Sequence, residues 1–122
     1  MLKARSKTRK RHIKGTMNKA EKAYSEHLKN DPYVCEFFFE SITLLLADNC
    51  RYTPDFMVQL IDGTIEFHEV KAFWKSKGKA HWEDDARVKI KVAAEKYPFI
   101  FYGVAQNGTK WEIENFTKEI AE

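Results

Sequence analysis

The sequence predicts an α/β domain in which a mixed central β-sheet is flanked by helices. Two segments carry apolar residues at helical spacing, and the regions around them are rich in aromatic and β-branched residues. The composition agrees, since 122 residues with 43% hydrophobic and 14% aromatic content suffice for one compact core. We expect a single domain over residues 17–122, with elements in the order α-β-β-β-α-β-β.

The first helix is predicted over residues 19–29. Its apolar stripe consists of Met17, Ala20, Tyr24 and Leu28. Glu21 falls on the same side as this stripe and can therefore reach the sheet. The spacing from Asn18 to Glu21 is also that of a capping box, in which Glu21 would bond back to the helix start. The sequence alone leaves both roles open.

Three strands should follow as an antiparallel meander. Residues 33–46 form either one long bent strand or two short ones, and the sequence does not decide between them. Residues 51–73 read as two strands joined by a tight turn at Asp62-Gly63, where glycine supplies the positive φ of a hairpin. This arrangement places Asp55 in the second strand of the meander and Glu69 in the third.

The remaining segments alternate between loop, helix and strand. A Lys-rich loop between Ala72 and Trp82 should lead into a helix over residues 83–96, which Pro98 ends. The apolar run 99–104 should be a buried strand parallel to the Glu69 strand. Residues 110–116 should return antiparallel as an edge strand.

The candidate metal-binding and catalytic residues are Asp55, Glu69 and Lys71. Glu69 and Lys71 are two residues apart, so in a strand both side chains point to the same face. Carboxylates suit a hard divalent cation, and a lysine beside them can orient or activate water. His68 alternates to the opposite face, and we expect it to be structural.

Asp55 and Glu69 share a face only in one register. A two-residue turn would set Asp55 opposite Val70, which points away from the face of Glu69. A three-residue loop over residues 61–63, or a β-bulge, would set Asp55 opposite Glu69. We therefore predict an odd loop or a bulge between the two carboxylates, with both near Lys71.

Pro54-Asp55 followed by Glu69-Val70-Lys71 resembles the signature of the PD-(D/E)xK nuclease superfamily, which has the restriction-endonuclease-like fold. The flanking runs 52–56 and 67–71 are similar to those of small phage endonuclease I-type nucleases. The resemblance implies a metal-dependent endonuclease that hydrolyses DNA phosphodiester bonds, with structure-specific action on junctions, branches or nicks in phage DNA processing.

The same resemblance implies a set of site residues. Mg²⁺, for which Mn²⁺ should substitute, would be held by Asp55, Glu69 and the backbone carbonyl of Val70. Glu21 matches the acid that such families often place on the first helix as a further ligand and catalytic residue. Lys71 would orient the attacking water or steady the phosphate.

Basic residues indicate where nucleic acid would bind. Residues 1–14 hold seven lysines and arginines and no acid, while the rest of the chain has 14 basic against 18 acidic residues. We expect residues 1–16 to be a disordered arm that contacts phosphate without reading sequence, although a solvated tail is the alternative. The candidate DNA-binding residues are Arg5, Arg9, Lys10 and Arg11 in the arm, Lys75 and Lys77 in the loop, and Arg87 and Lys91 on the second helix.

The sequence also predicts the cellular location, the state of the cysteines and the binding partners. The sequence shows neither a membrane-length apolar run nor a secretory h-region, so we expect a cytoplasmic protein without a membrane partner. Cys35 and Cys50 lack metal-ligand spacing and should be reduced. DNA is the expected partner, and junction cleavage would require paired sites, as in a homodimer. The competing class is a non-catalytic nucleic-acid-binding protein that uses the basic arm.

Deleting residues 1–14 should weaken DNA binding at low salt and flatten its salt dependence, because fewer counterions are released from phosphates. Fluorescence anisotropy across a salt series measures both quantities. Cleavage at saturating protein should persist. If neither the affinity for DNA nor its salt dependence changed, residues 1–14 would not act as a DNA-binding arm.

Overall fold

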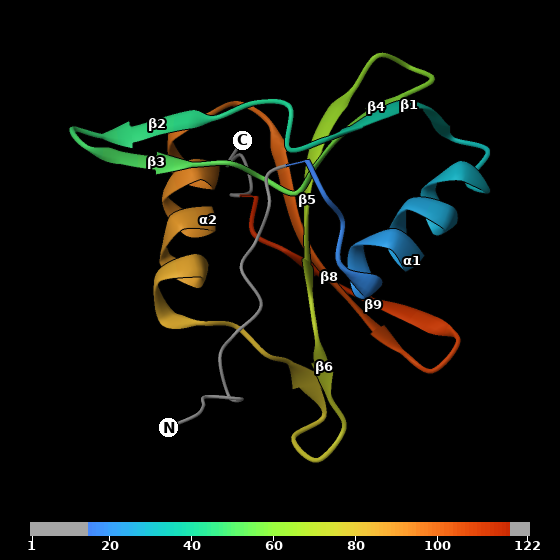
Figure 1. The fold of residues 1–122 in the computed structure, drawn as a ribbon. Helices are drawn as coiled ribbons and strands as arrows, with labels where there is room; N and C mark the ends of the chain where they lie inside the picture. Colours follow the sequence, from blue (N-terminus) through green and yellow to red (C-terminus); the bar gives the residue numbers. More distant parts are fainter. Residues whose placement is uncertain (1–14, 118–122) are drawn as a thin grey trace, which may run out of the picture.

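The structure is a computed structural model that describes residues 15–117 (Figure 1). Its elements, in chain order, are α1 (Lys19–Lys29), β1 (Val34–Phe39), β2 (Leu44–Ala47), β3 (Cys50–Tyr52), β4 (Phe56–Leu60), β5 (Ile65–Lys71), β6 (Phe73–Trp74), β7 (Lys79–Ala80), α2 (Asp84–Lys96), β8 (Ile100–Asn107) and β9 (Lys110–Asn115).

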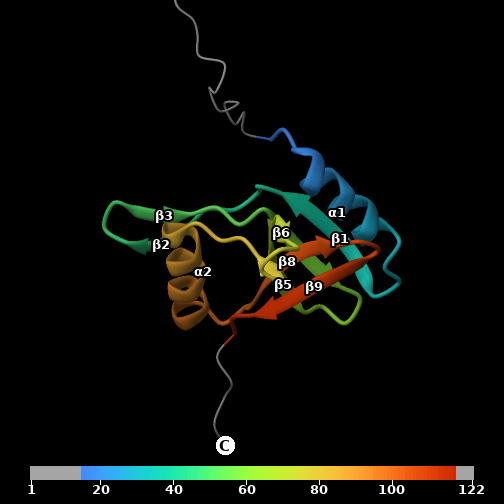
Figure 2. The same cartoon turned by 90° about the horizontal axis from the view of Figure 1, so that it is seen from below.

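Five strands form the central sheet, in the order β1-β4-β5-β8-β9. The β5–β8 pair is parallel and the other pairs are antiparallel, so the expected mixed sheet is confirmed. Strands β2 and β3 form a separate hairpin beside α2, and β6 and β7 form another at the far end of β5 (Figure 1). Helices α1 and α2 lie on opposite faces of the sheet (Figure 2). No helix within residues 15–117 has the length and apolar character needed to span a membrane.

Each face of the sheet has its own apolar core, because alternate strand residues point to opposite sides. On the α1 side the buried residues are Tyr24, Leu28, Phe56, Val58, Val70 and Val104. On the α2 side they are Leu44, Leu46, Tyr52, Phe67, Ile90, Ala93, Ala94 and Phe101. The β2–β3 hairpin therefore completes the core that α2 begins.

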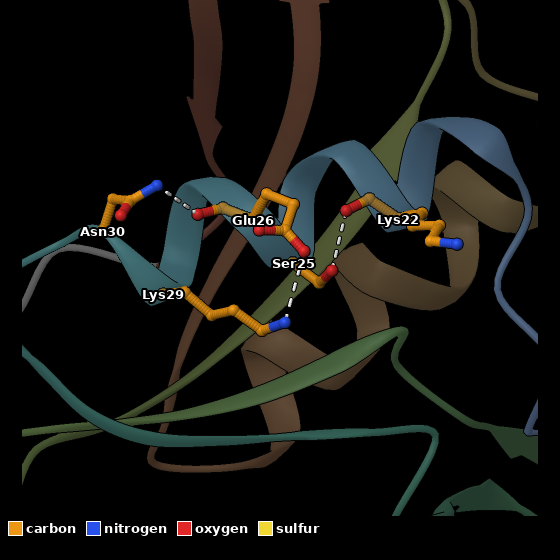
Figure 3. A network of polar contacts seen from close by, with 5 residues as sticks. All are labelled: Lys22, Ser25, Glu26, Lys29 and Asn30. Carbon is orange, nitrogen blue, oxygen red and sulfur yellow. Dashed lines mark hydrogen bonds and ion pairs between the residues drawn. The ribbon is translucent and has the colours of Figure 1, made fainter.

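The two helices begin and end close to where the sequence places them. Helix α1 spans the predicted residues. Near its C-terminal end, Lys29 forms an ion pair with Glu26 (3.2 Å), and the Asn30 side-chain amide donates to the Glu26 carbonyl (3.0 Å) (Figure 3). One turn earlier the Ser25 hydroxyl donates to the carbonyl of Lys22 at 2.7 Å. Helix α2 starts one residue later than predicted, with Glu83 as its N-cap.

The β4–β5 hairpin has the predicted register. Phe56 pairs with His68 and Gln59 with Ile65, and the Leu60 N–H donates to the Thr64 carbonyl at 2.9 Å. Three residues, 61–63, therefore form the loop. Gly63 has a φ of 91°, which an L-residue rarely adopts, so the left-handed glycine predicted for this loop is confirmed.

Residues 33–46, for which the sequence left one strand or two open, form the two strands β1 and β2. They pair antiparallel with β4 and β3, so the expected pairing with residues 51–60 is confirmed, although β2 and β3 lie outside the main sheet. Two sequence-based expectations need correction. The expected strand over residues 51–60 is broken, so Asp55 lies directly before β4 and not within a strand; Pro54 cannot donate to a sheet ladder, which explains the break. The Lys-rich loop contains the β6–β7 hairpin, in which Trp74 pairs with Lys79.

The core position of Phe56 yields a stability prediction. Phe56 is fully buried, whereas Phe38, on the neighbouring strand β1, is 42% exposed. Phe56→Ala should lower the free energy of unfolding by roughly 3–5 kcal/mol, as expected for a large core truncation. Phe38→Ala should cost much less. Urea unfolding of both variants measures the difference, and equal losses would contradict this description of the core.

Candidate active site

Asp55 is fixed at the point where the chain enters β4. Its Oδ2 accepts a hydrogen bond from the Val70 N–H at 2.8 Å, and its carbonyl accepts one from the Glu40 N–H at 2.8 Å. Its own N–H donates to Oε1 of Glu69 at 3.3 Å. Glu40 reaches this position with a φ of 48°, an unfavourable angle for a residue other than glycine. One contact to the carboxylate and two to the backbone therefore hold Asp55, a residue that is only 8% exposed.

Glu69 and Lys71 meet Asp55 at the end of β5. Lys71 Nζ lies 3.5 Å from Oε2 of Glu69, and the Tyr52 hydroxyl donates to Oε1 of Glu69 at 2.8 Å. The structure therefore brings the three predicted residues together. Sequence reasoning missed Tyr52 and Glu40; the position of Tyr52 three residues before Asp55 was the available signal.

The two carboxylates have perturbed acidity. The pKa of Asp55 is raised to about 8, chiefly by burial and then by the neighbouring charges of Glu69 and Glu21, while the Val70 N–H and Lys71 oppose the rise. Burial also raises the pKa of Glu69, against the lowering effects of Lys71 and Tyr52. Because the carboxylates interact strongly, their protons are lost as a pair. Such a pair is typical of a site that ionises fully only when a cation is present.

Glu21 forms the capping box. Its Oε1 accepts from the Asn18 N–H at 2.8 Å, while its own N–H donates to Oδ1 of Asn18 at 2.8 Å. The side chain is also buried, and its charge acts on Asp55. Within residues 15–117, no group of three or more His, Cys, Asp or Glu side chains is arranged to hold a metal ion. The capping role is therefore confirmed, and the role as a ligand stays a prediction.

The donor atoms nevertheless fit a hard divalent cation. The charges of Glu69, Glu21 and Lys71 all act on Asp55, and the Lys71 ammonium also pairs with Glu69. Buried negative charge in excess is costly unless a cation offsets it. The N–H of Val70 faces Asp55, and in a strand the carbonyl of the same residue points to the same side. Asp55, Glu69 and this carbonyl provide the oxygen ligands that Mg²⁺ prefers.

His68 lies on the other face of the sheet, as predicted. Its Nδ1 is 2.6 Å from the Tyr24 hydroxyl, and its Nε2 is 2.8 Å from Oε1 of Glu66. All three residues are buried, and this network links β5 to α1. Its geometry fits the structural role expected of His68.

A cavity of about 570 Å³ adjoins the site on the side of the β6–β7 hairpin. Its lining, which we call the Trp74–Trp82 pocket, consists of Trp74, Lys77, Lys79, Ala80, His81, Trp82, Arg87 and Glu114. Lys71 Nζ lies 5.1 Å from the ring centroid of Trp82, which joins the pocket to the carboxylates. The sequence drew attention to the lysines here but not to the stacked aromatic rings.

The predicted DNA-binding residues are divided by the structure. Lys77 and Arg87 line the Trp74–Trp82 pocket, and the Arg87 guanidinium makes two hydrogen bonds to Glu114, at 2.7 and 3.1 Å. Lys75 is exposed in the turn between β6 and β7, and Lys91 is exposed one helical turn beyond Arg87. The remaining four candidates lie outside the described residues, namely Arg5, Arg9, Lys10 and Arg11.

Comparison of the chain with protein families, curated proteins and solved structures gives no match in any of the three.

The raised pKa of Asp55 predicts how stability depends on pH without metal. Between pH 4 and 8 the folded state keeps a proton that the unfolded state has lost, so the free energy of unfolding falls as pH rises. Asp55→Asn keeps an acceptor for the Val70 N–H and should flatten this slope. At pH 8 it should stabilise the fold by on the order of 1–3 kcal/mol.

Urea unfolding at pH 5 and pH 8 in EDTA measures this effect. Asp62→Asn is the matched control, because Asp62 is an exposed carboxylate in the loop of the same hairpin. It should retain the wild-type slope between these two pH values. A slope in Asp55→Asn equal to that of the wild type would contradict the assigned pKa.

Proposed function

We propose that the chain is a Mg²⁺-dependent endonuclease that hydrolyses DNA phosphodiester bonds, with a PD-(D/E)xK site on a restriction-endonuclease-like fold. The observation that carries the proposal is the convergence of Asp55, Glu69 and Lys71 at the end of β5. The order of the helices and main-sheet strands along the chain, α1-β1-β4-β5-α2-β8-β9, also supports it.

Each site residue has a defined task in this proposal. Asp55, Glu69 and the Val70 carbonyl would hold Mg²⁺, which, when bound, acidifies water and offsets charge on the phosphate. Lys71, held beside Glu69, would orient the attacking water or neutralise charge that develops on the phosphate oxygens. Tyr52 and Glu40 are positioning residues, since they contact the two carboxylate residues.

The surroundings of the site favour a polyanionic substrate. Lys77, Lys79 and Arg87 line the adjoining pocket, and Glu114, its single carboxylate, is paired with Arg87. Cations with neighbouring aromatic rings are typical of surfaces that bind nucleic-acid strands. The arm at residues 1–16 would add contacts that do not depend on sequence. A homodimer would bring two such sites to a branched substrate.

A non-catalytic nucleic-acid-binding protein is the second candidate. The Trp74–Trp82 pocket favours it, because cationic and aromatic groups bind nucleic acid without any need for metal. Dependence of strand cleavage on a divalent metal separates the two functions. A protein that binds DNA equally well in Mg²⁺ and EDTA, and cleaves it in neither, would be a non-catalytic nucleic-acid-binding protein.

The direct test is incubation with supercoiled plasmid, linear duplex and a four-way junction, each in Mg²⁺, Mn²⁺ or EDTA. We expect nicking or cleavage of at least one substrate with either metal and none in EDTA. Asp55→Asn and Glu69→Gln should abolish cleavage, because each removes an anionic ligand. Lys71→Ala should lower the rate roughly 10²–10³-fold, as for loss of one preorganised donor.

Asp62→Asn serves again as the control, since it changes a carboxylate of the same hairpin away from the site. It should cleave like the wild type. Wild-type cleavage by Asp55→Asn would remove the basis of the nuclease proposal, as would cleavage that persists in EDTA.

A further inference from the structure

We propose that the Trp74–Trp82 pocket binds an unpaired nucleobase of the DNA strand that is cut, next to the scissile phosphate. This inference rests on the proposed nuclease function and specifies its substrate as DNA with a single-stranded segment at the cleavage point.

The rings of Trp74 and His81 form a ready stacking platform. Their centroids are 3.8 Å apart and their planes differ by 3°, so they already lie like two successive bases in a strand. Both side chains are exposed, with Trp74 at 40%. Flat aromatic surface kept accessible to solvent is what a nucleobase stacks on, and such stacking tolerates any base.

The pocket has the volume of a small-molecule site. At about 570 Å³ it falls within the range of roughly 300–1,000 Å³ that is common for ligand pockets. In a duplex each base face is covered by its neighbours in the stack, so an aromatic ring can reach that face only after the base is unpaired or flipped out. A pocket lined by stacked rings therefore favours an unpaired base over a paired one.

Trp82 forms the wall of the pocket nearest the carboxylates. A Cβ at Gly103 would clash with Cζ2 of Trp82, so the indole can lie on β8 only because residue 103 is glycine. The indole N–H is buried without a hydrogen-bond partner among the described residues, which is unfavourable for the folded state. The ring is nevertheless kept between β8 and the Lys71 ammonium, as a rigid link between the site and the pocket.

The charges of the pocket suit the phosphates that flank a bound base. Lys77 Nζ lies 5.5 Å from the centroid of the Trp74 ring, and the Arg87 guanidinium lies 6.0 Å from that of Trp82. The Glu114 carboxylate occupies the hydrogen-bonding edge of Arg87. An incoming phosphate would compete with Glu114 for this edge, so removing the Glu114 charge should favour binding.

The test is a binding measurement that needs no cleavage. Fluorescein-labelled 12-nucleotide oligothymidine and a blunt 12-base-pair duplex would be titrated in EDTA and followed by anisotropy. The wild type should prefer the single strand. Trp74→Ala should weaken single-strand binding roughly 5- to 150-fold, the range expected for loss of one stacked base, with little effect on the duplex. Trp74→Phe should retain most of the affinity, and Glu114→Gln should increase it.

A second readout reports stacking directly. An oligonucleotide with one 2-aminopurine should lose fluorescence on binding to the wild type and to Trp74→Phe, but not to Trp74→Ala. Equal effects of Trp74→Ala on single strand and duplex, or none on either, would overturn the pocket assignment even if cleavage is metal-dependent. Asp62→Asn, away from the site, should bind the single strand like the wild type. Because binding is measured in EDTA, absence of cleavage leaves the pocket assignment intact.

Discussion

Two carboxylates that are buried side by side impose the constraint on which the rest of this structure depends. Asp55 and Glu69 come from different arms of one hairpin, and they meet only because the loop has three residues and ends in a left-handed Gly63. Their mutual repulsion and loss of hydration are offset by hydrogen bonds from Val70 and Tyr52 and by the Lys71 ammonium. A divalent cation, as in the proposed function, would offset the charge that develops when both carboxylates ionise.

Different contacts on the two faces of the sheet position the strand that carries Glu69. On the α1 side, Tyr24, His68 and Glu66 form a satisfied polar network that fixes β5 against the helix. On the α2 side, Gly103 leaves room for Trp82, which extends the surface from Lys71 towards Arg87 and the β6–β7 hairpin. Strand β5 therefore presents Glu66 and His68 to α1 and presents Glu69 and Lys71 to the other side, as the alternation of a strand requires.

Sequence periodicity was sufficient for the helices, and the crossover through a helix predicted the parallel β5–β8 pair. The hairpin register was predicted by requiring Asp55 and Glu69 to share one face. Periodicity failed where long-range contacts decide. Pro54 breaks the expected strand before Asp55, and the departure of β2 and β3 from the main sheet follows from packing on α2, which no local pattern encodes. Asp55, Glu69 and Lys71 were found from residue type and spacing. Tyr52, Glu40 and the Trp74–His81 stack were not, because their roles arise from tertiary contacts.

The claim that the Asp55–Glu69 pair is a cation site is tested most directly by Mn²⁺ binding, followed through the loss of the free-ion signal in electron paramagnetic resonance at pH 8. This measurement requires neither DNA nor turnover. We expect saturable binding by the wild type and by Asp62→Asn, and loss of that binding in Asp55→Asn and in Glu69→Gln. Equal Mn²⁺ binding by all four proteins, or none by the wild type, would contradict this claim.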